Sequence, residues 1–242
     1  CPQGDQEHAG LAAVEAAHGT AEKRDVSDLA ACYGAEYEKT ALCHGRDLAY
    51  VAAKAAAKEL TAKIKAGLTD LNFIDVEFSM EFTRLSHFTA GGFDEAEFMI
   101  STNPGESVKP LGMVASGGEL SRIMLAIKTV LADTDDIPTL IFDEIDTGIS
   151  GRTAQMVSEK LSYIAKNHQV ICITHLPQIA AMADAHYEIA KTAADGRTTT
   201  TIRPLAEAEM VEELARLLGG AKITEAVREN AREMKRLAGE RK

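Results

Sequence analysis

The stretch TLIFDE at residues 139–144 is where the fold of this chain is decided. Its apolar residues form a short strand, and two acids follow directly. A second apolar stretch, VICIT at residues 170–174, is followed by His175. Apolar spacings of three and four predict helices over residues 119–131 and 152–165. Apolar strands that alternate with amphipathic helices are typical of a parallel sheet covered by helices, so we predict an α/β fold.

The remaining periodicity predicts more helices and a small antiparallel sheet that precedes these motifs. The additional helices are predicted over residues 48–71, 208–218 and 224–237, with a short one that starts at Pro177. The additional strands are predicted over residues 74–82, 96–101, 187–191 and 198–203.

Composition limits the classes of function that the chain can have. Its 242 residues carry a net charge of −11 with a pI near 5.1, which argues against broad electrostatic binding of nucleic acid by its surface. It has no apolar run of about 18 residues, so we expect no membrane span. Its four cysteines form no C-x-x-C pair, which favours a reduced cytoplasmic setting over a metal site. The chain begins with Cys1 rather than Met, and we expect it to be a piece of a longer protein.

A glycine-rich turn opens the helix predicted at residue 119, where residues 116–122 read SGGELSR. Ser116 followed three residues later by Glu119 matches a capping box, which is an ordinary way to start a helix. Gly117 and Gly118 each weaken a helix by about 1 kcal/mol relative to alanine, so a purely structural start has little reason to carry them. Bare backbone N–H groups at a helix start approach an anion closely. We therefore predict a phosphate site, with the capping box as the alternative.

Two acids and a histidine are predicted to lie at one edge of the parallel sheet. In open α/β sheets, ligands bind beyond the carboxyl ends of the strands. There Asp143 would coordinate Mg²⁺, and Glu144 would orient and deprotonate a water molecule aimed at a terminal phosphate. His175 would hydrogen-bond the phosphate or the water. The alternatives are an acidic turn and a structural histidine.

The segment DTGISG at residues 146–151 is predicted to be a tight loop before a helix capped by Ser150. It is either an ordinary strand-to-helix turn or a loop that reports the nucleotide state across an interface, and the sequence leaves both open. No G-x-x-x-x-G-K-[ST] segment occurs in the 242 residues, so the loop that grips nucleotide phosphates is not among them.

Taken together, these motifs resemble the ABC-type ATPase heads of SMC-like proteins. The segments that carry the resemblance are VASGGELSR at 114–122, TLIFDEIDTGISG at 139–151 and ITHLPQIA at 173–180. ELARLLGG at 213–220 and STNPG at 101–105 are similar to a branch of this family that acts in bacterial DNA repair.

The resemblance implies an ATPase that uses ATP and Mg²⁺ in the recombinational repair of DNA double-strand breaks, in the bacterial cytoplasm at the nucleoid. Two heads would sandwich ATP in a homodimer, and DNA would bind the full assembly. Asp143 would bind Mg²⁺, Glu144 would be the catalytic base and His175 the switch histidine. The ATP contacts, partly to nucleotide held by the opposite head, would come from Ser116, Gly117, Gly118, Glu119, Thr147, Gly148 and Ser150.

The family's head is split in sequence, so the resemblance also implies a division of the chain. Residues 73–242 would be the C-terminal lobe of the head, and residues 45–72 the end of a coiled-coil arm that returns to it. Residues 1–44, helical or disordered, stay unassigned. The N-terminal lobe with the phosphate loop would be a partner, without which the chain is inactive. Two other readings are a structural or interaction module without turnover and the ATPase subunit of a transporter.

Overall fold

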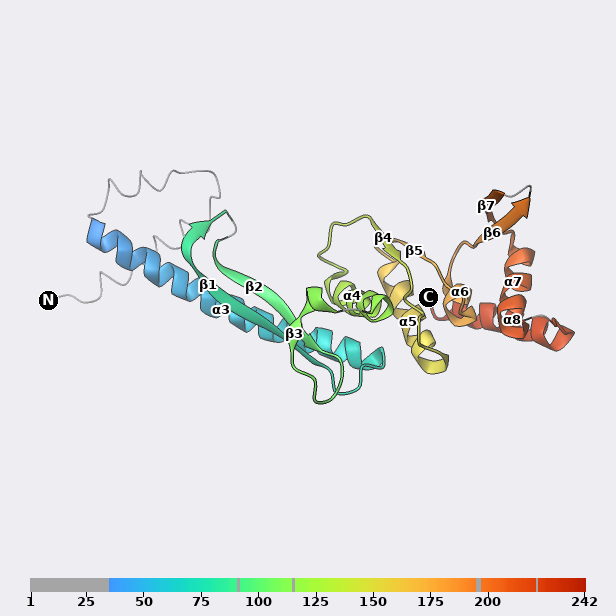
Figure 1. Ribbon diagram of the computed structural model, residues 1–242, viewed down its shortest axis with the longest axis horizontal. Helices are drawn as coiled ribbons and strands as arrows, with labels where there is room; N and C mark the ends of the chain where they lie inside the picture. The colour runs from blue at the N-terminus through green and yellow to red at the C-terminus, as the bar shows by residue number, and fades with distance from the viewer. Residues whose placement is uncertain (1–34, 91, 115, 195–196, 221) are drawn as a thin grey trace. The chain divides into compact units, whose positions relative to one another are not determined.

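A computed structural model describes residues 35–90, 92–114, 116–194, 197–220 and 222–242 (Figure 1). In chain order its elements are α3 (Ala35–Asp70), β1 (Glu77–Thr89), β2 (Gly92–Ser101), β3 (Lys109–Pro110), the 3₁₀ helix η1 (Leu111–Met113), α4 (Gly117–Leu131), β4 (Thr139–Phe142), α5 (Gly151–Ile164), β5 (Gln169–Cys172), α6 (Pro177–Met182), β6 (Tyr187–Ala194), β7 (Arg197–Pro204), α7 (Glu207–Gly219) and α8 (Glu225–Glu240).

The chain separates into two compact units. One contains α3 up to Glu59 together with Met80–Glu97, and the other contains Leu60–Ser79 and Phe98–Lys242. In the first unit, Arg84 donates a hydrogen bond of 2.9 Å from Nη2 to Oδ1 of Asp47. The same guanidinium lies 4.4 Å from the centroid of the Tyr50 ring. The second unit contains every residue predicted for the site.

The helix predicted over residues 48–71 is confirmed as part of the longer α3. Its C-terminal turns bury Ile64, Leu68 and nearby Leu71 in the main core. Leu48 and Val51, which the periodicity places on the same apolar face, are 54% and 64% exposed. The prediction for the start of the chain lies outside the described residues up to residue 34, and residues 35–44 are helical. None of the described helices is both long enough and apolar enough to cross a membrane.

The first predicted strand is wrong at its start. The alternation of apolar residues begins at Ile74, but β1 begins at Glu77, and Ile74 is 68% exposed. Asn72 and Asp75 have positive φ angles of 69° and 58°, so the backbone turns here before it becomes extended. Alternation reports side-chain polarity and does not report these turns. β1, β2 and β3 then form the predicted small sheet, in which β2 and β3 are antiparallel.

The predicted α/β arrangement of parallel strands and helices is confirmed. β4 and β5 are parallel, with Thr139 opposite Gln169 and Phe142 opposite Cys172. Helices α4 and α5 contribute buried Ile123 and Val157 to the core on one face of this pair. None of the described segments covers the other face of this pair. Its residues Ile141, Ile171 and Ile173 are 68%, 45% and 48% exposed.

A smaller second core lies at the C-terminal end of the chain. The strands predicted over residues 187–191 and 198–203 are confirmed as parts of β6 and β7, which pair antiparallel. Helices α7 and α8 follow at nearly the predicted positions. The buried side chains of this core come from α6, α7 and α8, and are Ala181, Met182, Leu214, Ala215, Ala231 and Ala238.

A buried histidine fixes the connection between α4 and β4. His168 has Nδ1 at 2.7 Å from the carbonyl oxygen of Ile137 and Nε2 at 3.0 Å from that of Ala132. Carbonyl oxygens only accept, so both contacts are hydrogen bonds when both ring nitrogens carry a proton. These two backbone hydrogen bonds raise the pKa of His168. The segment is further held by an ion pair between Lys128 and Asp135.

Candidate functional site

The carboxyl ends of β4 and β5 bring the predicted acids and histidine to one edge. The two strands stay paired beyond their last residues, because the amide of Ile173 donates to the carbonyl oxygen of Phe142 at 3.0 Å. Asp143 and Glu144 follow β4 at this edge, and His175 follows β5. Asp143, Glu144 and His175 are exposed, so their side chains are accessible to a ligand.

The start of α4 packs against the segment that follows β4. Ser121 donates a hydrogen bond of 2.8 Å from Oγ to the carbonyl oxygen of Asp143. A Cβ atom added to Gly118 would lie 3.0 Å from the carbonyl oxygen of Glu144 and 3.0 Å from Cβ of Thr147. At Gly117 an added Cβ would overlap the Glu144 carboxylate. The two glycines therefore permit a close approach within this chain, and this packing role stands beside the predicted role in binding phosphate.

The predicted capping box is present only in its first half. Ser116 is the N-cap residue of α4, and its Oγ accepts a long hydrogen bond of 3.4 Å from the amide of Glu119. The Glu144 carboxylate lies at the same helix start, beside Gly117. Unpaired N–H groups at a helix N-terminus favour an anion. A carboxylate of the chain itself thus lies beside the position that the sequence predicts for a phosphate.

The acid pair has an unusual backbone. Glu144 has a φ of 56°, in the left-handed region that residues other than glycine rarely adopt. Its amide donates a hydrogen bond of 2.9 Å to Oδ1 of Asp143, and the amide of Thr147 donates to the carbonyl oxygen of Glu144 at 3.0 Å. Strained backbone of this kind is found disproportionately at functional sites. Here it aims the Glu144 side chain toward the start of α4.

Arg122 hydrogen-bonds the loop that follows Asp143 and Glu144. Its Nη1 donates a hydrogen bond of 2.8 Å to the carbonyl oxygen of Thr147 and a longer one of 3.4 Å to that of Ile145. The guanidinium lies 5.6 Å from the centroid of the Phe73 ring. Arg122 is 8% exposed, and burial lowers its pKa, partly offset by the charge of Glu119. Arg122 is part of the motif at residues 116–122, but nothing in the sequence indicates these contacts.

Asp146 connects the two loops at this edge, and sequence reasoning also missed it. Its Oδ2 accepts hydrogen bonds from Oγ1 of Thr174 at 2.6 Å and from the amide of His175 at 2.8 Å. Nδ1 of His175 lies 3.0 Å from the same oxygen. The sequence did hold a sign of this contact. Asp146 follows one predicted strand, and Thr174 and His175, which can donate hydrogen bonds, stand at the end of the next one.

The predicted loop at residues 146–151 takes a tight turn. Gly148 has a φ of 74° and Gly151 a φ of 54°. Ser150 is the N-cap residue of α5, but its side chain makes no capping hydrogen bond, so the predicted cap is wrong in this respect. Thr147, Gly148 and Ser150 are exposed, and they lie in the loop that precedes α5.

The donor set limits the metal that this edge can hold. Within the described ranges, no group of three or more His, Cys, Asp or Glu residues is placed to hold a metal ion. Burial, helped by the charges of Asp146 and Asp143, raises the pKa of Cys172 to about 12, so its thiol stays protonated and is no ligand. The exposed carboxylates at this edge are those of Asp143 and Glu144. This fits Mg²⁺, which is usually bound by one or two carboxylates, waters and the phosphates of a substrate.

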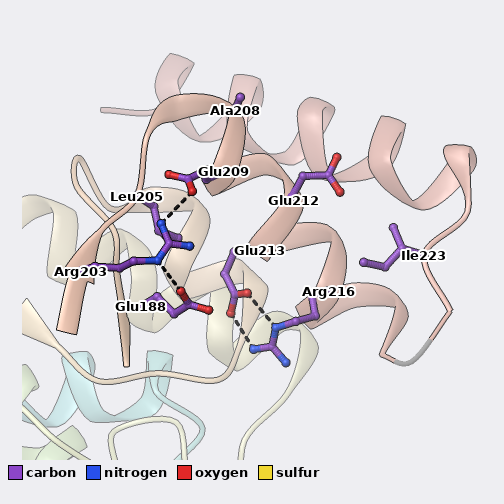
Figure 2. Close-up of a pocket in the computed structure, with 9 residues that line it drawn as sticks. All are labelled: Glu188, Arg203, Leu205, Ala208, Glu209, Glu212, Glu213, Arg216 and Ile223. Carbon is purple, nitrogen blue, oxygen red and sulfur yellow. Dashed lines mark hydrogen bonds and ion pairs between the residues drawn. The ribbon is translucent and has the colours of Figure 1, made fainter. Parts of the chain in front are cut away.

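A separate hollow near the C-terminal helices contains none of the predicted site residues. Figure 2 shows it between β6, β7 and α7. Its charged side chains are paired: Arg203 bonds Glu188 and Glu209, Arg216 bonds Glu213, and Glu212 bonds Arg228 outside the hollow. Since these charges are already paired, the hollow offers a ligand less than the edge of the parallel sheet does.

The curated relatives that the chain matches are DNA repair proteins named RecN. The chain is 48% identical over 189 residues to the DNA repair protein RecN of Halalkalibacterium halodurans, covering 76% of this chain and 34% of that protein. It is 43% identical over 193 residues to the DNA repair protein RecN of Bacillus subtilis, covering 75% of this chain and 34% of that protein. The chain therefore spans about a third of the length of the curated relatives it matches.

Among solved structures, the Smc head domain with a coiled coil and joint from Pyrococcus yayanosii is 22% identical to this chain. That match covers 74% of this chain and 32% of that chain, with a TM-score of 0.43. No protein-family model matches the chain.

Proposed function

Because the chain belongs to the family of the DNA repair protein RecN, we propose that it forms one half of an ATPase head that acts in bacterial DNA double-strand break repair. The observation that carries the proposal is the meeting of three predicted motifs. The start of α4, the acid pair after β4 and His175 after β5 are joined by hydrogen bonds of Ser121, Arg122 and Asp146. The corresponding location is the bacterial cytoplasm, at the nucleoid.

Each predicted residue has a role in this proposal that its surroundings support. Asp143 would hold Mg²⁺, which when bound neutralises charge on the phosphates of ATP. Glu144 would accept a proton from the attacking water. His175 would hydrogen-bond the terminal phosphate or that water. The remaining contacts to ATP, partly to nucleotide of a second head, would come from Ser116, Gly117, Gly118, Glu119, Thr147, Gly148 and Ser150.

A second lobe is part of the proposal. Parallel strands are normally buried on both faces, yet Ile141, Ile171 and Ile173 leave one face of the β4–β5 pair exposed. An N-terminal lobe that supplies the phosphate loop would cover this face. Residues 45–72 would end a coiled-coil arm, for which exposed Leu48 and Val51 on α3 supply apolar contacts. DNA would bind the complete assembly rather than this acidic chain.

The position of the Glu144 carboxylate suggests how a second head would join. The carboxylate lies beside Gly117, where the terminal phosphate of ATP held by the opposite head would arrive. Like charges cannot share this helix start, so Glu144 would turn away toward the water when two heads close over ATP. Heads would therefore join only with nucleotide, in a homodimer.

The experiment that tests the proposal measures ATP hydrolysis by the chain alone, by the chain mixed with its N-terminal lobe, and by the mixture with DNA. We expect no activity alone, activity on mixing and stimulation by DNA. Glu144→Gln should retain ATP binding, lower kcat by about 100-fold or more and accumulate ATP-dependent dimers. Ser116→Arg, which fills the helix start, should prevent those dimers and leave nucleotide binding by the N-terminal lobe intact. An associated but inactive mixture would instead favour a non-catalytic interaction module.

A further inference from the structure

The carboxylate of Asp146 is buried and contacts His175 at the candidate site. The Asp146 side chain is only 5% exposed, although it follows the exposed acids by two residues. It accepts from Oγ1 of Thr174 at 2.6 Å and from the amide of His175 at 2.8 Å, and Nδ1 of His175 lies 3.0 Å from the same Oδ2 atom. Oγ1 of Thr174 in turn accepts from the amide of Leu176 at 3.0 Å. A buried charge is tolerated when it is hydrogen-bonded in this way.

These contacts determine which nitrogen of His175 carries the proton. An ionised carboxylate only accepts hydrogen bonds, so Nδ1 of His175 must be the donor. In the neutral ring Nε2 then has a free lone pair. The His175 side chain is 71% exposed, so Nε2 is the nitrogen that a ligand at the edge of the sheet reaches. Without Asp146 the ring would have neither a preferred tautomer nor a fixed direction.

The same loop is held from its other side by the helix that starts at the glycines. Arg122 of α4 donates to the carbonyl oxygens of Ile145 and Thr147, which flank Asp146 in sequence. A shift of α4 therefore moves the backbone at Asp146, and Asp146 moves His175. The contacts form one continuous path from the start of α4 to the histidine.

We propose that Asp146 is the positioning residue of this site: it sets the tautomer and direction of His175 and links them, through Arg122, to the start of α4. The proposal deepens the proposed function and rests on it for the effect on turnover. Its structural half, the tautomer of His175, stands without ATP hydrolysis.

The first test measures the tautomer in the complete chain without nucleotide. ¹⁵N NMR of the histidine rings is recorded above the ordinary histidine pKa of about 6.5, and His175→Gln identifies the signals. Wild-type His175 should show a protonated Nδ1 and an unprotonated Nε2. In Asp146→Ala no carboxylate remains to accept from Nδ1, so the ring should shift toward the tautomer protonated at Nε2. Signals of His175 that are identical in wild type and Asp146→Ala would overturn the proposal.

The second test measures turnover in the assembled head. Asp146→Ala should lower kcat by about 10- to 100-fold, as loss of a residue that orients an active group commonly does, and change KM little. Thr174→Val removes one donor to Asp146 and leaves the contact with His175, so its kcat should stay near that of wild type. Equal losses of kcat in both variants would mean that Asp146 only stabilises the loop, and would overturn the proposal.

A matched control separates this proposal from the proposed function. Asp184→Asn removes an exposed carboxylate that is paired with Lys242, and it should change neither the NMR signals of His175 nor kcat. If wild type hydrolyses ATP and Asp146→Ala is equally fast, the positioning role fails and the ATPase stands. If wild type is inactive but Asp146→Ala changes the tautomer, the ATPase fails and the structural role of Asp146 stands.

Discussion

Replacing Arg122 by methionine tests whether one buried cation holds the loop that follows the acid pair. Methionine keeps an unbranched apolar stem of similar course and removes the guanidinium. The change deletes the hydrogen bonds to the carbonyl oxygens of Thr147 and Ile145, at 2.8 and 3.4 Å, and the contact with the Phe73 ring. The loop would lose its anchor on α4, while the hydrophobic core around Ile123 would stay intact.

The size of the effect follows from these contacts. A hydrogen bond to a charged group contributes about 1.5–3 kcal/mol, and only the 2.8 Å bond has good length. The contact with the Phe73 ring adds about 0.5–1 kcal/mol. Against this, methionine removes the cost of burying a charge, which is also what lowers the pKa of Arg122. We expect a net loss of about 2 kcal/mol in the free energy of unfolding.

The assay is urea unfolding followed by far-ultraviolet circular dichroism. With a denaturant slope of about 2 kcal/mol per molar, the midpoint should fall by about 1 M. Arg232→Met is the matched control, because Arg232 is exposed and pairs with Glu225 at the surface at 3.0 Å. Such pairs contribute about 0–1 kcal/mol, so the control should change little. An Arg122→Met variant within about 0.5 kcal/mol of wild type would refute the reasoning.

Two further predictions concern the titration of His168 and the packing of Gly117 and Gly118. The pKa of His168 is raised by its two backbone hydrogen bonds, so its contribution to stability is complete below the unfolded pKa of about 6.5 and is lost as the pH rises through the folded pKa. The difference in unfolding free energy between wild type and His168→Gln should therefore shrink as the pH rises through the folded pKa, and a constant difference would contradict this role of the protonated ring. Gly118→Ala should destabilise by about 1–2 kcal/mol because its methyl group meets loop backbone, whereas Gly117→Ala meets only the movable Glu144 carboxylate and should be neutral or stabilising by up to about 1 kcal/mol. Thermal unfolding of the two variants checks this, and equal shifts would contradict the packing of the glycines.

The sequence alone determined the helices and strands whose bounds depend only on residues that are neighbours in the chain. The run TLIF at residues 139–142 marks β4, because Pro138 precedes it and two acids follow it. Proline at residue 177 starts α6, since its fixed φ suits the first turn of a helix. The rule that ligands bind beyond the carboxyl ends of parallel strands was also enough to place Asp143 and His175 at one edge. The sequence pattern failed at Ile74, because positive φ angles at Asn72 and Asp75 turn the backbone there although the polarity alternates as in a strand.

Only the tertiary structure decided how the site is held together. Asp146 and His175 are 29 residues apart in sequence, and Arg122 and Thr147 are 25 apart. In the sequence Asp146 reads as an ordinary loop acid, yet it is buried and accepts hydrogen bonds from Thr174 and His175. The glycines likewise read as a phosphate loop, and the structure adds that they make room for the loop after β4. Periodicity and motif spacing report what a residue's neighbours in sequence are, whereas burial and hydrogen-bond partners depend on which segments the fold brings together.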